Sequence, residues 1–153
     1  MNRTHAPLTA LAGVALAALS AGSLSSQEAR EYINSRSAST PDAPPFSGAV
    51  RVGNTLYVSG TLGLNPGQQV PATAEEEARN VLSNIKTTLE AAGMTMDDLV
   101  SVQVHCSDVA HYDAFNAVYR TFFTREFPAR AFLGSGPLLF GARFEVLGIA
   151  VRR

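Results

Sequence analysis

The chain has 153 residues, of which 46% are apolar, and this is enough for one hydrophobic core but not for two. Its 12 Lys and Arg residues are balanced by 13 Asp and Glu residues. Proteins that bind the phosphate backbone of nucleic acids normally carry a basic excess, so the composition argues against a nucleic-acid partner. We therefore expect a single domain.

A short apolar segment opens the chain. Arg3 precedes a run at positions 8–19 that is almost wholly Ala, Leu, Val and Gly, and small residues follow through Ser23. This order is typical of a secretory signal peptide, and the run is shorter than the roughly 20 residues that cross a bilayer. We expect residues 1–23 to be removed and the mature protein to be periplasmic or secreted without membrane contact. The alternative is an N-terminal tail on a cytoplasmic protein.

Residues 24–44 are rich in Ser, Pro, Ala and charged residues and show no periodicity, so we expect a linker before a domain at 45–153. The domain begins with two short β-rich runs, 49–52 and 55–59. They flank the dipeptide Gly53-Asn54, which is typical of a two-residue hairpin turn. A loop is expected from Gly60 to Pro71.

A helix is expected after this loop. Thr73 and Glu76 form a capping box, and Gly93 is placed to end the helix. Between them apolar residues recur at helical spacing, namely Ala78, Val81, Leu82, Ile85, Leu89 and Ala92. Because one face of this helix is apolar, we expect it to pack on a sheet.

The single cysteine lies in the next expected strand, 99–106. Val100, Val102, Val104 and Cys106 alternate with polar residues, which predicts that the four point inward and that the thiol is buried. One cysteine cannot form an intramolecular disulfide. A second amphipathic helix over 111–123 and strands over 129–133 and 142–151 complete the pattern.

The resulting order, ββαβαββ, predicts an α+β fold with one mixed sheet and both helices on one face. In the last strand Phe144, Val146 and Ala150 alternate with Leu147, Ile149 and Val151. Neither face of such a strand suits water, so we expect a homo-oligomer that covers the open face of the sheet.

Several segments, at matching positions and in matching order, resemble the Rid (YjgF) family of small trimeric proteins. They are Val50 to Gly60, Phe115 to Tyr119 with Phe122-Phe123, Phe127-Pro128-Ala129-Arg130, and Glu145 with Gly148-Ile149-Ala150-Val151. The resemblance covers about residues 45–152. It implies a chorismate-mutase-like fold, a homotrimer, and ligand sites in the clefts between subunits.

The resemblance also assigns site residues. It makes Arg130 the group that binds a substrate carboxylate and Glu145 the group that holds the attacking water. Phe46, Ser59, Gly60, Asn116, Ala131 and Phe132 then belong to the substrate-binding site. Ser59 and Asn116 could equally be structural. Phe46 replaces a frequent Tyr and Phe132 a frequent small Cys, so substrate size or activity could differ.

The two principal residues also suit these roles chemically. The planar fork of the Arg130 guanidinium fits a carboxylate with two parallel hydrogen bonds, which Lys cannot form. Glu145 lies in an apolar strand, where an unpaired charge is costly, so it needs a partner or a function. The alternatives are an ordinary ion pair for Arg130, and a pairing of Glu145 with Arg143 or with Arg130 itself.

The leading expectation is therefore hydrolytic deamination of 2-imino and 2-enamino acids to 2-keto acids and ammonia. No cofactor is expected, because a protonated imine is already a strong electrophile. No metal site is expected either, since His105 and His111 lack a third ligand at metal spacing. The alternative is a Rid-fold protein that binds a small carboxylate without turning it over. A ribonuclease is disfavoured by the acidic balance.

Overall fold

The computed structural model describes residues 29–34, 40–41 and 43–153. The expected signal peptide, residues 1–23, lies outside the described residues. Within the described part of the chain, no helix combines the length and the apolar character needed to cross a membrane.

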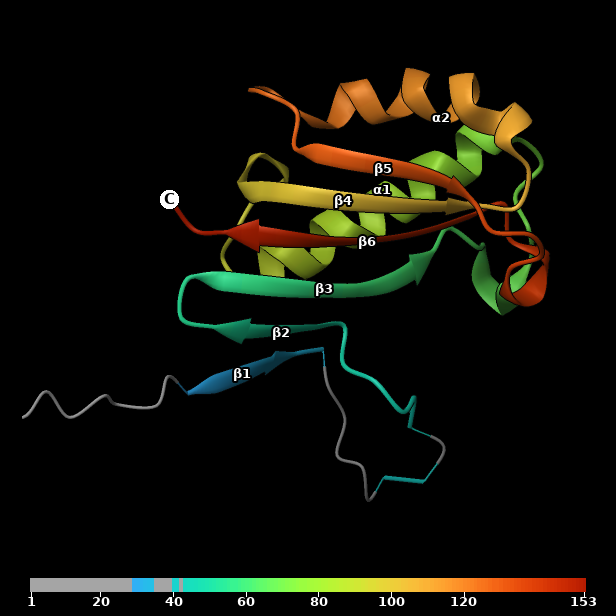
Figure 1. Cartoon of the computed structure of the whole chain (residues 1–153). Coiled ribbons are helices and arrows are strands. Elements are labelled where there is room, and N and C mark those ends of the chain that lie inside the picture. The colour runs from blue at the N-terminus through green and yellow to red at the C-terminus, as the bar shows by residue number, and fades with distance from the viewer. Residues whose placement is uncertain (1–28, 35–39, 42) are drawn as a thin grey trace, which may run out of the picture.

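The described residues form one six-stranded sheet with two helices (Figure 1). In chain order the elements are β1 (Arg30–Ile33), β2 (Ala49–Val52), β3 (Thr55–Leu62), α1 (Ala74–Ala91), β4 (Leu99–Cys106), α2 (Tyr112–Tyr119), β5 (Ala129–Gly134) and β6 (Phe144–Val151). The strands lie in the order β1-β2-β3-β6-β4-β5. The expected α+β class and the order ββαβαββ from residue 49 onward are confirmed, with β1 added in front.

Two local predictions hold in detail. Strands β2 and β3 pair antiparallel with Val52 opposite Thr55, so Gly53 and Asn54 form the turn, and Gly53 has the positive φ of 57° that such a turn favours. At the start of α1 the side chain of Thr73 accepts a hydrogen bond from the backbone N–H of Glu76, as the capping box predicts.

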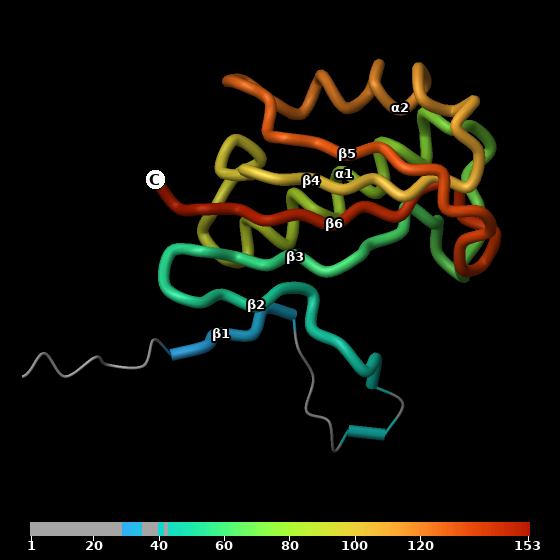
Figure 2. The backbone as a smooth tube through the Cα atoms, in the orientation of Figure 1, coloured from blue at the N-terminus to red at the C-terminus, as the bar shows by residue number. Residues whose placement is uncertain are grey.

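The last strand is the centre of the sheet. Strand β6 pairs antiparallel with β3 on one side and with β4 on the other, although β3 lies more than 80 residues earlier (Figure 2). Strand β5 pairs parallel with β4 at the sheet edge, and α2 connects the two. Parallel neighbours require a crossover connection, and α2 forms part of it.

Both helices pack on the same face of the sheet, which we call the covered face. Buried side chains of β6 on this face include Phe144 and Val146, and the Phe144 ring lies 4.9 Å from the ring of Phe115 on α2. Cys106 is buried on this face as well, and its thiol contacts the backbone carbonyl of Asp108 at 2.9 Å. Burial raises the pKa of this thiol, which suits its predicted role as a small core residue.

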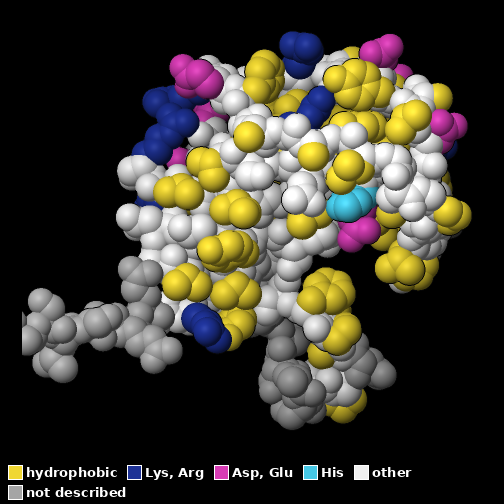
Figure 3. Space-filling view, in the orientation of Figure 1, with side chains coloured by type: hydrophobic (Ala, Val, Ile, Leu, Met, Phe, Trp, Pro, Cys, Tyr) yellow, Lys and Arg dark blue, Asp and Glu magenta, His cyan; other side chains and the backbone are white. Residues whose placement is uncertain are grey.

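The opposite, open face has no helix over it. Leu147 and Ile149 of β6 are half-buried there, while Tyr57 of β3 and Leu133 of β5 are exposed. The space-filling view shows hydrophobic side chains spread across this face (Figure 3). The expectation that neither face of β6 is polar is thus correct.

Four sequence-based expectations differ from the structure. The expected linker contributes β1, which pairs antiparallel with β2. Strand β3 continues to Leu62 through a bulge, so Gly60 lies within a strand rather than a loop. The α-helical part of α2 ends at Tyr119, and one 3₁₀ turn follows. Val100 is 48% exposed instead of inward-facing, because the pairing of β4 with β6 shifts register beside it.

Candidate functional site

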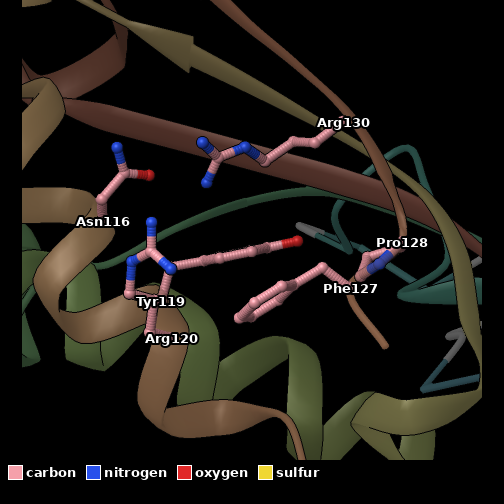
Figure 4. A pocket seen from close by; sticks show the side chains of 6 residues that line it. All are labelled: Asn116, Tyr119, Arg120, Phe127, Pro128 and Arg130. Atoms are coloured by element: carbon pink, nitrogen blue, oxygen red, sulfur yellow. The ribbon is translucent and has the colours of Figure 1, made fainter. Parts of the chain in front are cut away.

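Arg130 lies at a cavity between α2 and the edge strand β5. The cavity has a volume of about 180 Å³ and is lined by Asn116, Tyr119, Arg120, Phe127, Pro128 and Arg130. The polar ends of Asn116, Arg120 and Arg130 point into it in the close view (Figure 4). The structure therefore brings two of the expected site residues, Arg130 and Asn116, to one small cavity.

The guanidinium of Arg130 rests on an aromatic ring rather than on a carboxylate. Its central carbon lies 4.6 Å from the centre of the Tyr119 ring, a distance typical of a cation–π contact. None of the ion pairs among the described residues involves Arg130. The ring thus supports the flat side of the guanidinium, and among the described residues no carboxylate occupies its N–H donors.

The Tyr119 ring lies against the Arg130 guanidinium, and Tyr119 is itself buried. Only 4% of the residue is exposed, and within the described chain its hydroxyl has no hydrogen-bond partner. Burial raises the pKa of the phenol to about 12, although the nearby Arg130 acts in the opposite direction. Tyr119 therefore stays neutral and supports Arg130 through its ring.

Phe132 lies next to the guanidinium of Arg130 and packs against α2. Its ring packs edge-on against Tyr112 at 5.0 Å and against Phe115 at 5.6 Å. Phe132 is not among the residues that line the cavity, but the central carbon of the Arg130 guanidinium lies 5.9 Å from the centre of its ring. Ala131 points to the open face, since its register partner on β4 is Gln103.

Glu145 lies on the open face. Its register partner on β4 is His105, and its carboxylate packs directly on the backbone of Gly60 in β3. A Cβ atom at residue 60 would collide with Oε1 of Glu145, so glycine is what allows this approach. No ion pair of the described residues includes Glu145.

The alternative partner for Glu145, Arg143, is engaged elsewhere. Its guanidinium donates to the carboxylate of Glu77 at 2.8 Å, and its backbone N–H donates to the same carboxylate at 2.5 Å. The backbone N–H of Phe144 is a third donor at 3.0 Å. Glu77 is fully buried, so these contacts compensate the removal of its charge from water.

Sequence reasoning missed Glu77, which fixes the start of β6 and so the strand that carries Glu145. A signal was present: Glu77 falls in the helical stripe between Ala74 and Val81, and both of these residues are buried. A carboxylate in an apolar stripe requires a buried partner.

Two further predicted site residues, Phe46 and Ser59, lie before and after β2. The hydroxyl of Ser59 donates to the backbone carbonyl of Ser47 at 2.6 Å, which ties β3 to the segment before β2. This bond favours a structural role for Ser59. Phe46, in the same segment, is 63% exposed, so its ring is available to a ligand or to another chain.

Arg130 and Glu145 lie on opposite faces of the sheet within one chain. Arg130 is paired in register with Val102, a buried residue of the covered face, whereas Glu145 is paired with His105 on the open face. Side chains of register partners share a face. Within one chain the two side chains therefore do not face a common cavity.

Comparison with known proteins identifies the family. A family model described as Endoribonuclease L-PSP matches residues 37–152. The chain belongs to this family. A goat protein named 2-iminobutanoate/2-iminopropanoate deaminase is 42% identical over 120 residues, which cover 74% of this chain and 88% of the relative. An Escherichia coli K12 protein of the same name is 35% identical over 127 residues, 78% of this chain and 99% of the relative. These relatives confirm the resemblance to the Rid family.

Solved structures agree with this family fold. The crystal structure of the E. coli YjgF gene product superposes with a TM-score of 0.68 at 35% identity, covering 78% of this chain and 94% of that one. RidA from Psychrobacter gives a TM-score of 0.68 at 30% identity, with coverages of 79% and 98%. E. coli TdcF, solved with bound serine, gives 0.71 at 26% identity, with coverages of 80% and 99%.

Proposed function

We propose that this Rid-family protein hydrolyses 2-imino acids, and the 2-enamino acids in equilibrium with them, to 2-keto acids and ammonia. The observation that carries the proposal is the guanidinium of Arg130, which forms no ion pair with the described residues and rests on Tyr119 at a small cavity. The names of relatives at 35–42% identity support the reaction class. The serine bound to TdcF supports a ligand that carries a carboxylate.

In the proposed mechanism, Arg130 binds the substrate carboxylate through two parallel hydrogen bonds and so orients the protonated imine. Glu145 accepts a proton from water as the water oxygen forms a bond to the imine carbon. Glu145 then passes this proton to the amine nitrogen of the tetrahedral adduct. As the C–N bond breaks and ammonia leaves, the carboxylate of Glu145 accepts the hydroxyl proton of the adduct and later releases it to water. A C=O bond replaces the C=N bond, and no oxidant or reductant is required.

We further propose that the active form is a homotrimer with its sites between subunits. The half-buried Leu147 and Ile149 give the open face an apolar centre that a second copy can cover. Because β5 is an edge strand, its Arg130 lies at the rim of the sheet, where Glu145 of a neighbouring copy can approach. Light scattering that shows a stable monomer at micromolar concentration would contradict this assembly.

Export of the protein also remains a proposal, supported by the composition of residues 1–23. Expression of the full chain in a Gram-negative host should give a periplasmic form that is shorter by about 21 to 23 residues, which intact-mass analysis would detect. A full-length chain in the cytoplasm would contradict it.

A coupled assay tests the reaction itself. An amino-acid oxidase generates imines from amino acids with different side chains, and release of ammonia is followed with and without this protein. We expect faster imine hydrolysis with the protein and none of this acceleration with Arg130→Ala. If no imine is hydrolysed faster, while calorimetry still detects binding of keto acids, the function is binding of small carboxylates without turnover.

A further inference from the structure

A second arginine shares the cavity with Arg130. Arg120 opens the 3₁₀ turn directly after α2, whereas Arg130 lies on β5, so two different elements deliver positive charge to one place. In Figure 4 the two guanidinium groups and the amide of Asn116 all point into the same space. The lining contains no acidic residue.

Neither arginine is neutralised by the described part of the chain. The ion pairs found there use Arg51, Lys86, Arg143 and Arg153 as cations. Arg120 instead contacts an aromatic ring, with its central carbon 5.8 Å from the centre of the Phe127 ring. Two like charges at one cavity repel each other, and an anionic ligand removes that repulsion.

The charge exceeds what the proposed reaction requires. One guanidinium fork is sufficient to bind one carboxylate bidentately. If Arg130 takes the carboxylate next to the imine, the donors of Arg120 remain for a second acidic group. The cavity of about 180 Å³ is smaller than the roughly 300–1,000 Å³ of sites for drug-sized ligands, so the second group must belong to a compact molecule.

We infer that Arg120 determines specificity for 2-imino dicarboxylates, the imines of acidic amino acids. Arg130 binds the carboxylate beside the imine, Arg120 binds the side-chain carboxylate, and the Asn116 amide donates to one of them. For its substrate this inference rests on the proposed function. The preference for a second carboxylate can nevertheless be measured by binding alone, without turnover.

The test compares ligands of similar length that differ in the terminal charge. The imines of glutamate and norleucine, generated by suitable oxidases, are compared for kcat/KM, and 2-oxoglutarate is compared with 2-oxohexanoate by calorimetry. In the wild type we expect the dicarboxylate to be favoured at least about tenfold in both measurements, since a charge-assisted bidentate pair exceeds 1.4 kcal/mol. In Arg120→Gln this ratio should fall to about one. The control Arg79→Gln, on the exposed side of α1, should keep the wild-type ratio.

Each result decides the inference. It is wrong if the wild type shows no preference for the dicarboxylate, or if Arg120→Gln keeps that preference. It is also wrong if Arg120→Gln weakens both keto acids equally, because both arginines would then bind the same carboxylate. If no imine is turned over but the calorimetric preference disappears in Arg120→Gln, the inference holds and the proposed function fails.

Discussion

The covered face and the open face of the sheet differ in how far the protomer itself buries their apolar side chains and supplies hydrogen bonds to their carboxylates. On the covered face Phe144 and Val146 are buried, and the carboxylate of Glu77 receives three hydrogen bonds. On the open face Leu147 remains half-buried, and the carboxylate of Glu145 packs on the backbone of Gly60 and forms no ion pair with the described residues. Stability therefore depends mainly on the first face, while the second is available for assembly and chemistry.

The two residues proposed to act on the substrate also lie on different faces. Arg130 belongs to the covered face and has a rigid aromatic support, whereas Glu145 belongs to the open face. On the covered face, some substitutions should therefore lower the stability of the fold, and others should weaken ligand binding. Those on the open face should change turnover with little change in the stability of the protomer.

The largest effect is expected from Glu77→Ala on the covered face. This substitution leaves the backbone N–H groups of Arg143 and Phe144 without their acceptor and the Arg143 guanidinium without its counter-charge. We expect the free energy of unfolding to fall by about 3 kcal/mol or more, measured by urea denaturation. Glu75→Ala, an exposed carboxylate in the same helical turn, should cost only a few tenths of a kcal/mol. Equal losses in the two variants would show that the Glu77 contacts do not stabilise β6.

The next largest effect is expected from Arg130→Lys, which keeps the charge but removes the planar fork and its contact with Tyr119. The value of kcat/KM for imine hydrolysis should fall on the order of 100-fold, because a charge-assisted bidentate pair is replaced by a single contact. Glu145→Gln should instead lower kcat and leave binding of 2-keto acids nearly unchanged. Similar activity in Arg130→Lys and wild type would contradict the fork geometry.

A smaller effect is expected from Gly60→Ala on the open face. The added methyl group must displace the carboxylate of Glu145. We expect kcat to fall roughly tenfold, because a shift of about 1 Å in a catalytic group is costly, while the unfolding midpoint changes little. In Gly134→Ala, the control, the added Cβ meets only the Val109 side chain at 3.2 Å, and activity should be retained. Undiminished turnover in Gly60→Ala would show that Glu145 takes no part in the reaction.

The smallest effect is expected from Tyr119→Phe, which removes a buried hydroxyl without a partner in the described chain and keeps the ring under Arg130. The free energy of unfolding at neutral pH should stay equal or rise by up to about 1 kcal/mol. Burial holds the pKa of this phenol at about 12, above its ordinary value of 10.0. The folded state therefore keeps the proton longer, and wild-type stability should fall between pH 10 and 12 more than that of the variant. A lower stability of Tyr119→Phe at pH 7 would indicate an unseen partner for the hydroxyl.

Local signals in the sequence predicted local structure well. The Gly53-Asn54 turn and the Thr73 cap determine the hairpin and the start of α1 from neighbouring residues alone. The place of β6 between β3 and β4 could not be found in this way, because strand pairing over so long a separation leaves no local pattern. Strand β1 was missed because its side chains are mostly exposed, so the segment shows no apolar alternation.

The sequence suggested members of the site but not their arrangement. Resemblance supplied Arg130, Glu145 and Asn116, and the alternation of Phe144 with Glu145 was visible in the sequence. What the sequence could not show is that β5 is aligned on β4 so that Arg130 and Phe132 face the helices. Arg120 was also missed, because its place at the cavity depends on the turn that ends α2.

Complementation between two inactive variants tests most directly whether the active site joins the two faces from different copies. Arg130→Ala and Glu145→Ala are unfolded together in equal amounts, refolded, and assayed for imine hydrolysis against each variant refolded alone. If each site takes Arg130 from one subunit and Glu145 from the next, one of the three sites in every mixed trimer is intact. This is roughly a quarter of all sites in a random mixture, so about a quarter of wild-type activity should return. No recovery, with light scattering showing that mixed oligomers have formed, would contradict a site shared between subunits.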